Sequence, residues 1–281
     1  MQLEFPIAHD GPPAIPPILV GTCGYSYKDW IGTYYPPRTK PSSMLSYYAA
    51  HFHAVEIDST YYRVPAPNSF ATMVERTPPH FRFAVKLPGS ATHVPRGGTP
   101  LPTEIPAFRE AIEPLVRAGR LSCALMQFPH SFAPSPAAEK RLAELRDALA
   151  DIALVAEFRN RAWQTHDTLA LLESLGVGWC NVDEPQFSKL LRPSADVVGP
   201  IAYVRFHGRN YQQWWNAKTG DLRYDYLYTA EELEPWAQRL VDLRANADVR
   251  EVLAFFNNHR RGQAVRNAEM LSAMLETRLR Q

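Results

Sequence analysis

The chain has 281 residues, 46% of them hydrophobic and 21% charged, and its 30 basic and 29 acidic side chains leave a formal net charge of +1. Such a chain can bury a large core, and its near-neutral charge argues against a strong general attraction to nucleic acid or anionic membranes. Cys23, Cys123 and Cys180 are widely spaced and form no C-x-x-C motif, which argues against a disulfide framework and a cysteine zinc site.

The first 17 residues, MQLEFPIAHDGPPAIPP, lack a basic start, and prolines interrupt every apolar run in them. They predict an N-terminal leader segment rather than a signal peptide, followed by one domain over residues 18–281. No apolar run reaches the length of a membrane span. We therefore expect a cytoplasmic protein without a membrane partner.

Short apolar or β-branched runs predict eight strands along the chain. They cover residues 18–22, 54–58, 81–87, 122–128, 152–158, 177–183, 201–207 and 251–257.

Apolar residues at helical spacing separate most of these strands. One such helix follows Ser135, a candidate N-cap, and another follows Thr229, which stands in capping-box register with Glu232. The link between residues 183 and 201 is too short for much helix. Alternating strands and helices predict a parallel sheet, and eight units close most simply into a single-domain (β/α)8 TIM barrel. An open doubly wound sheet is the second interpretation.

The link that follows the strand at residues 201–207 is long and rich in aromatic residues. It contains Tyr211, Trp214, Trp215, Tyr224, Tyr226 and Tyr228. Loops of this kind are typically lids or binding loops, or they fold onto their own aromatic side chains, and the sequence leaves both interpretations open. Tyr211, the first of these residues, is a candidate ligand-binding residue.

Polar residues stand at the carboxyl ends of the predicted strands, which line the active face of a barrel. They are Glu56, Asp58, Lys86, Gln127, Glu157, Arg159, Asn181, Asp183, Arg205, His207, Asn257 and Asn258. Buried charges are costly unless they are paired, so this set indicates either a ligand site or a network of ion pairs. For any single pair we favour the ion pair, and for the whole set we favour a site.

The residue types suggest catalytic roles. His207 has an ordinary pKa near neutrality and suits general acid or base work together with Glu56 or Glu157. Lys86 could stabilise an enolate or a phosphate, or act as an amine nucleophile if it is desolvated. Its alternative is an ion pair with one of the two glutamates.

The sequence also bears on ligands and cofactors. Arg159 and Arg205 could bind a carboxylate or phosphate group through paired hydrogen bonds. A divalent metal is conceivable but not favoured, because H-E-x-x-H and Cys/His clusters are absent; its ligands would be Glu56, Glu157, Asp183 and His207. The nucleotide loops G-x-x-x-x-G-K-[ST] and G-x-G-x-x-G are absent as well. The sequence therefore leaves the cofactor unknown.

The chain contains, in this order, the motifs GTCGYSYKDWIGTYYP, VEIDSTYYRVP, FRFAVKLP, MQFPHSF, AEFRNRAW, YVRFHGRN, RYDYLY and FFNNHRRGQAVRNA. This series resembles the YecE-like family, the domain of unknown function 72. The resemblance runs from about Leu19 to the C-terminal helix and implies a TIM barrel with a loose sugar-isomerase-related label. It implies three further site residues, Tyr25, Trp30 and Trp163. The chain departs from the family pattern at Asp58, where Asn is common, and at Tyr25, where Trp is common.

Together these observations favour an enzyme that binds a small polar, sugar-like or phosphorylated ligand and transfers protons. A metal-dependent phosphodiester hydrolase resembling barrel endonucleases is one alternative. A non-enzymatic protein that captures a metabolite or a single nucleic-acid strand is another, although the near-neutral charge disfavours nucleic acid as a partner. The sequence does not predict the oligomeric state.

Overall fold

The computed structural model describes residues 18–93 and 100–280, so the predicted leader lies outside the described residues. Every strand expected from the sequence is present within one or two residues of its predicted bounds. The strands are β1 (Ile18–Thr22), β2 (Ala54–Ile57), β3 (Arg82–Lys86), β4 (Leu121–Gln127), β5 (Leu154–Glu157), β6 (Val177–Asp183), β7 (Ile201–Phe206) and β8 (Glu251–Phe256).

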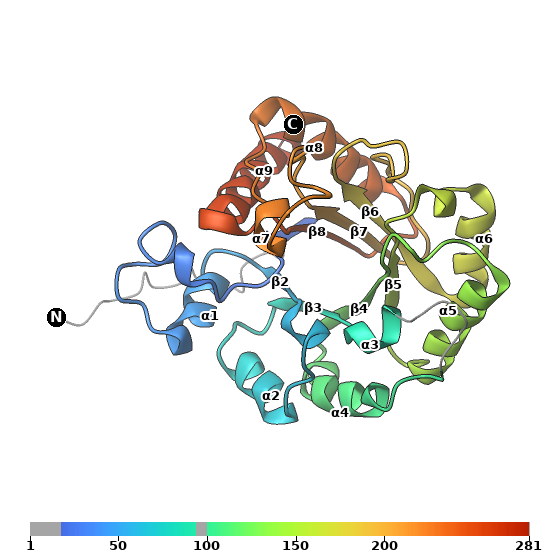
Figure 1. Cartoon of the computed structure of the whole chain (residues 1–281). Helices are drawn as coiled ribbons and strands as arrows, with labels where there is room; N and C mark the ends of the chain where they lie inside the picture. Colours follow the sequence, from blue (N-terminus) through green and yellow to red (C-terminus); the bar gives the residue numbers. More distant parts are fainter. Residues whose placement is uncertain (1–17, 94–99, 281) are drawn as a thin grey trace.

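All strand pairs are parallel, and their order is β1-β8-β7-β6-β5-β4-β3-β2. The two ends of the sheet meet through a bridge between Cys23 and Glu56, where the Gly24 amide donates to the Glu56 carbonyl at 2.7 Å. Figure 1 looks along the resulting barrel, with the strands around its axis and most helices outside them. The prediction of a (β/α)8 TIM barrel is confirmed.

Helices follow most strands and cover their outer faces. The α-helices are α1 (Pro41–Ala49), α2 (Pro67–Glu75), α3 (Gly89–Thr92), α4 (Glu104–Arg117), α5 (Pro136–Ala148), α6 (His166–Leu175), α7 (Gly220–Arg223), α8 (Ala230–Ala245) and α9 (Gln263–Leu279). Short 3-10 turns are η1 (Lys28–Trp30), η2 (Ser59–Tyr61), η3 (Arg161–Trp163) and η4 (Arg260–Gly262).

Local sequence signals fix several helix ends as predicted. The Ser135 side chain accepts a hydrogen bond from the Ala138 amide and caps α5, and Thr229 with Glu232 forms a complete capping box at the start of α8. The link between β6 and β7 contains no helix, in agreement with its short length.

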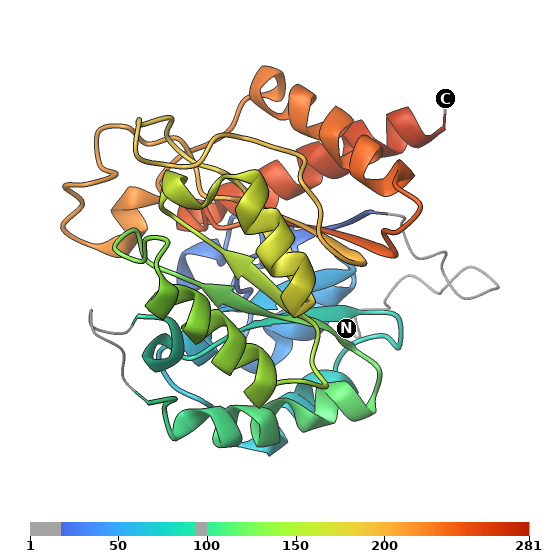
Figure 2. The same ribbon diagram turned by 90° about the vertical axis from the view of Figure 1, so that its right-hand side faces the viewer.

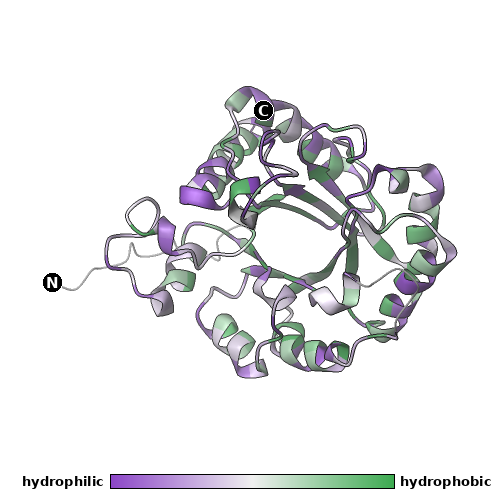
Figure 3. Cartoon of the chain, viewed as in Figure 1, coloured by the Kyte–Doolittle hydropathy of each residue, from purple (hydrophilic) through white to green (hydrophobic). Residues whose placement is uncertain are grey.

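The barrel strands are mainly hydrophobic, whereas the surrounding helices contain both hydrophobic and hydrophilic residues, as Figure 3 shows. Cys23, Cys123 and Cys180 are free thiols buried in this core. In the described part of the chain, no helix is both long and apolar enough to cross a membrane.

Two short helices lie over the carboxyl ends of the strands rather than outside the barrel. In Figure 1, α3 and α7 lie inside the ring of longer helices, and in Figure 2 the orange segment with α7 lies at one end of the barrel. This segment belongs to the aromatic-rich link between β7 and α8. The structure therefore places that link at the end of the barrel where the predicted polar residues are located.

Candidate functional site

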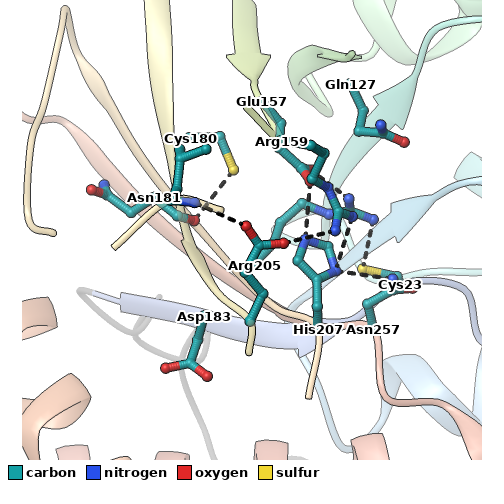
Figure 4. A network of polar contacts seen from close by, with 12 residues as sticks. Cys23, Gln127, Glu157, Arg159, Cys180, Asn181, Asp183, Arg205, His207 and Asn257 are labelled. Carbon is teal, nitrogen blue, oxygen red and sulfur yellow. Dashed lines mark hydrogen bonds and ion pairs between the residues drawn. The ribbon is translucent and has the colours of Figure 1, made fainter. Parts of the chain in front are cut away.

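Arg205, at the end of β7, is the centre of a buried ion cluster inside the barrel (Figure 4). Its Nη1 lies 2.5 Å from Glu157 Oε2 and its Nη2 lies 2.7 Å from Glu56 Oε1. The Tyr203 hydroxyl donates to Glu56 Oε2 at 2.7 Å. None of these side chains is more than 2% exposed, so one guanidinium and one phenol satisfy two carboxylates that have lost their water.

His207 lies just above this cluster and is completely buried. Its Nε2 is 3.0 Å from Glu157 Oε1, while its Nδ1 faces Asn257 Nδ2 at 3.1 Å and Arg159 Nη2 at 3.4 Å. Burial lowers the pKa of His207 to about 3, and Arg159 adds to the effect. The imidazole is therefore neutral near pH 7, with its proton on Nε2 and its Nδ1 facing two donors.

Arg159, after β5, connects the cluster to the space above it. Its Nε lies 2.6 Å from Glu157 Oε1 and its Nη1 lies 3.1 Å from Glu184 Oε2. Burial alone would raise the pKa of Glu157, but Arg159, Arg205 and His207 hold it well below its usual range. Burial raises the pKa of Glu184 to about 7 against the opposing charge of Arg159.

Asp183 belongs to a separate network on the other side of β7. Its carboxylate accepts two hydrogen bonds from Arg209 at 2.8 and 2.6 Å, one from the Tyr228 hydroxyl at 2.8 Å and one from Trp236 Nε1 at 2.6 Å. No dashed line joins Asp183 to the other residues drawn in Figure 4. This carboxylate attaches the β7–α8 link and α8 to the barrel.

A cavity of about 270 Å³ opens above the ends of β3, β4 and β5. Three of the predicted site residues line it, namely Lys86, Gln127 and Arg159. The loops above the strand ends contribute Tyr61, His93, His130, Trp214, Arg223 and Tyr224.

Lys86 lines this cavity without a carboxylate partner. Its Nζ donates to Gln127 Oε1 at 2.8 Å and lies 4.2 Å from the centre of the Tyr61 ring. No carboxylate of the described residues comes within ion-pair distance of it. Burial lowers the pKa of Lys86 to about 8, Arg205 adds to the effect, and the more distant Glu157 and Glu56 only partly oppose it.

Arg223, from α7, is the third cation of the cavity. Its guanidinium lies 5.8 Å from the centre of the Trp214 ring, and its buried Nε has no hydrogen-bond partner. Among the carboxylates whose side chains the structure describes, none forms an ion pair with it. Because Arg159 stacks on the same Trp214 ring at 5.8 Å, one indole holds two guanidinium groups at the cavity.

Two imidazoles complete the polar lining. Burial lowers the pKa of His93 to about 4, with Lys86 and Arg159 adding to the effect, so its ring is neutral at pH 7. The buried Nε2 of His130 has no hydrogen-bond partner. Since none of the residues that line the cavity is a carboxylate, its polar surface is suited to an anion.

The structure divides the predicted polar ring into layers. Lys86, Gln127 and Arg159 meet in the cavity, whereas Glu56, Glu157, Arg205, His207 and Asn257 lie beneath it in the ion cluster. Asp58 is half-buried next to Glu56, and burial raises its pKa.

The remaining predicted residues lie outside both layers. Tyr25 faces a different hollow beside α1 and α2, and the Tyr211 hydroxyl accepts from the Gln186 amide at 3.0 Å. Four more hydrogen-bond to neighbouring groups of the protein itself, namely Trp30, Trp163, Asn181 and Asn258.

Several cavity residues were not among the predicted ones: Tyr61, His93, His130, Trp214, Arg223 and Tyr224. The aromatic link after β7 contained three of them, so its composition carried part of the signal. His93 and His130 follow the ends of β3 and β4 within a few residues, a position from which a side chain can reach the mouth of a barrel.

Comparisons with known proteins agree with the fold. A family model described as "Protein of unknown function DUF72" matches residues 19–281. The UPF0759 protein YunF of Bacillus subtilis is 30% identical over 275 residues, which cover 92% of this chain and 95% of that protein.

Two solved structures of DUF72 family proteins are also similar. One, from Thermotoga maritima, is 40% identical with a TM-score of 0.83 and covers 92% of this chain and 99% of its own. The other, from Enterococcus faecalis, is 26% identical with a TM-score of 0.80 and covers 92% of this chain and 95% of its own.

Proposed function

The chain belongs to the DUF72 family, and from its site we propose that it is an enzyme that binds a small phosphorylated, sugar-like ligand in the cavity above β3, β4 and β5. The observation that carries the proposal is the lining of this cavity, which includes the cations Lys86, Arg159 and Arg223 but no carboxylate side chain.

Arg223 is the strongest support for an anionic ligand. Its guanidinium is held over Trp214 while its buried Nε lacks a partner, and such an unsatisfied group costs free energy until an acceptor reaches it. A phosphate group supplies several acceptors and matches the planar guanidinium. Arg159 is already paired with Glu157 and Glu184, so it contributes positive potential more than free donors.

The rest of the cavity suits the body of a small molecule. Its volume of about 270 Å³ lies just below the range of about 300–1,000 Å³ that is common for ligand pockets. Trp214 and Tyr224 offer flat apolar faces, and Gln127 and His130 offer polar contacts for hydroxyl groups. A phosphorylated molecule of a few carbons would fill it.

Two lining groups support proton transfer. The pKa of Lys86, lowered by burial to about 8, leaves a sizeable neutral fraction near neutral pH, and the neutral imidazole of His93 can accept a proton. His207 is less accessible, because Glu157, Asn257 and Arg159 surround both of its ring nitrogens. We therefore assign the acid/base chemistry to Lys86 and His93.

A metal-dependent hydrolase receives less support from this residue set. In the described part of the chain, no group of three or more His, Cys, Asp and Glu side chains is placed to hold a metal ion. Of the four ligands expected from the sequence, Asp183 is held by Arg209, Tyr228 and Trp236, away from the other three.

Calorimetric titration with matched pairs of ligands tests the binding. We expect glycerol 3-phosphate and small sugar phosphates to bind, and glycerol and the free sugars not to bind. Arg223→Met should weaken binding about ten- to hundredfold, the loss of one or two charged hydrogen bonds. Arg239→Met is the matched control, because Arg239 also stacks on a tryptophan, at 4.9 Å from the Trp236 ring centre, but outside the cavity. Equal affinity for both members of each pair would contradict the proposal.

Proton exchange tests the enzymatic part. A sugar phosphate bound in deuterium oxide should exchange the hydrogen next to its carbonyl group, and proton NMR follows the loss of that signal. Wild-type protein that binds such ligands but exchanges no hydrogen of any of them would be a binding protein instead.

A further inference from the structure

Lys86 differs from every other lysine of the chain in its surroundings. The sequence contains six lysines, and Lys28, Lys40, Lys140, Lys189 and Lys218 are all exposed, whereas Lys86 is half-buried at the end of β3. Its amine points into the cavity that we assign to the ligand, between the Gln127 amide and the Tyr61 ring. The amine of Lys86 is therefore placed to contact a ligand bound in this cavity.

We propose that Lys86 forms an imine with the carbonyl group of a phosphorylated aldehyde or ketone bound in this cavity. This inference rests on the proposed function and narrows its ligand to carbonyl compounds. Arg223 binds the phosphate group and Arg159 adds positive potential, which leaves the Lys86 amine free to react with another part of the molecule.

Gln127 explains how the amine stays in place without becoming a fixed ammonium ion. Its Nε2 donates to the Phe128 carbonyl at 2.9 Å, which orients its Oε1 toward Lys86 Nζ at 2.8 Å. A carboxylate at this position would stabilise the ammonium form of Lys86. The neutral amide of Gln127 positions the amine and stabilises the ammonium form much less. Gln127 is thus a positioning residue for Lys86.

Burial and a neighbouring positive charge also favour the neutral form of the Lys86 amine. Burial and the charge of Arg205 lower the pKa of Lys86 to about 8. At pH 8 about half of the Lys86 side chains are then neutral, roughly a hundredfold more than for an ordinary lysine. Desolvation and a nearby cation are the two ways in which proteins activate an amine nucleophile.

The reaction balances with groups that line the cavity. The neutral amine attacks the carbonyl carbon, and one of its two protons passes to the neutral ring of His93, which lies 5.0 Å from the same Tyr61 ring that Lys86 contacts. His93 delivers this proton to the carbonyl oxygen, which gives a neutral carbinolamine. The carbon–oxygen bond of the carbinolamine then breaks as His93 carries the second nitrogen proton to the departing hydroxyl, which leaves as water. One carbonyl and one amine become one imine and one water, with no oxidant or reductant.

Reductive trapping tests this step. The full chain is incubated with dihydroxyacetone phosphate and cyanoborohydride at pH 8, digested, and mapped by mass spectrometry. We expect one adduct at Lys86, formed at least about tenfold faster than at any other lysine because of its larger neutral fraction. Lys86→Met should remove it, whereas Lys189→Met, at an exposed lysine near the cavity, should retain it. Labelling of Lys86 no faster than the other five lysines would overturn the inference.

Two controls separate this inference from the proposed function. Glycerol 3-phosphate carries the phosphate but no carbonyl, so it should bind, form no adduct and protect Lys86 from dihydroxyacetone phosphate. If it binds while Lys86 forms no adduct, the imine fails and the anion site stands; if neither compound binds, both proposals fail. Gln127→Glu should slow the labelling at pH 8 about tenfold or more while a higher pH restores it, because the new carboxylate raises the pKa of Lys86.

Discussion

His207 Nε2 lies 3.0 Å from Glu157 Oε1 in an interior where neither side chain is exposed to solvent. Only Glu157 is charged in this pair. Burial lowers the pKa of His207 to about 3, whereas the carboxylate of Glu157 stays ionised next to two arginines. The neutral imidazole donates a hydrogen bond to the buried carboxylate and so helps to fix the position of both side chains in the barrel interior. This relationship has a measurable consequence for stability.

The free energy of unfolding should fall as the pH drops below about 6.5. The unfolded chain then protonates His207, whereas the folded chain resists protonation until about pH 3. The folded pKa is depressed, so the stabilisation is present above the unfolded pKa and is lost toward the folded one, with a slope approaching about 1.4 kcal/mol per pH unit. Urea unfolding between pH 7 and 4 measures it, and His207→Gln should flatten the profile. An unchanged slope in His207→Gln would contradict this account.

Removing Arg205 should destabilise the protein strongly. Arg205→Met leaves Glu56 and Glu157 buried without their shared cation, which costs about 3–5 kcal/mol. Arg82→Met provides the comparison, because the Arg82–Glu251 pair is partly exposed and separated by 3.6 Å, and such pairs contribute about 0–1 kcal/mol. Urea denaturation of both variants measures the loss in the free energy of unfolding. Similar losses for both would show that Arg205 does not neutralise two buried carboxylates.

The sequence predicted the fold closely because the fold depends on local patterns. Eight apolar runs and the caps at Ser135 and Thr229 are readable one segment at a time, and the right-handed, parallel connection of such units leaves few topologies. The strand ends lie within two residues of their predicted limits, and where they differ, hydrogen bonding to a neighbouring strand decides the last residue.

The site was less predictable, because its layers depend on distances between strands. The alternation of side chains along a strand predicted that Arg205 and His207 share one face of β7. It did not predict that Glu56 from β2 and Glu157 from β5 contact them. The cavity also uses Arg223 and Trp214 from a long link whose path over the barrel is set by tertiary contacts, such as the pairing of Arg209 with Asp183.

The hydroxyl of Tyr228 joins the β7–α8 link to the barrel and should contribute measurably to stability. It accepts from the Gly208 amide at 2.8 Å and donates to Asp183 Oδ1 at 2.8 Å. Tyr228→Phe leaves a buried amide without its acceptor, at a cost of about 1–3 kcal/mol. Tyr62→Phe, at a ring that is 85% exposed, is the control and should change the urea midpoint very little. Equal midpoints for the two variants would show that this hydroxyl does not hold the link.

Ligand binding at pH 8 should take up protons. A phosphate bound at Arg223 in the same cavity favours the ammonium form of Lys86 and raises its pKa, which burial has lowered to about 8, so a fraction of a proton enters with the ligand. Titration with glycerol 3-phosphate in two buffers of different ionisation enthalpy measures the uptake. Lys86→Met should abolish it, and a wild-type titration that does not depend on the buffer would place the anion away from Lys86.

The most direct measurement is a crystal structure grown with saturating glycerol 3-phosphate. We expect the phosphate group within hydrogen-bond distance of Arg223, with the glycerol hydroxyls beside Lys86 and Gln127 in the cavity that Trp214 also lines. A phosphate group bound at another place on the protein, with this cavity lacking the ligand, would contradict this expectation.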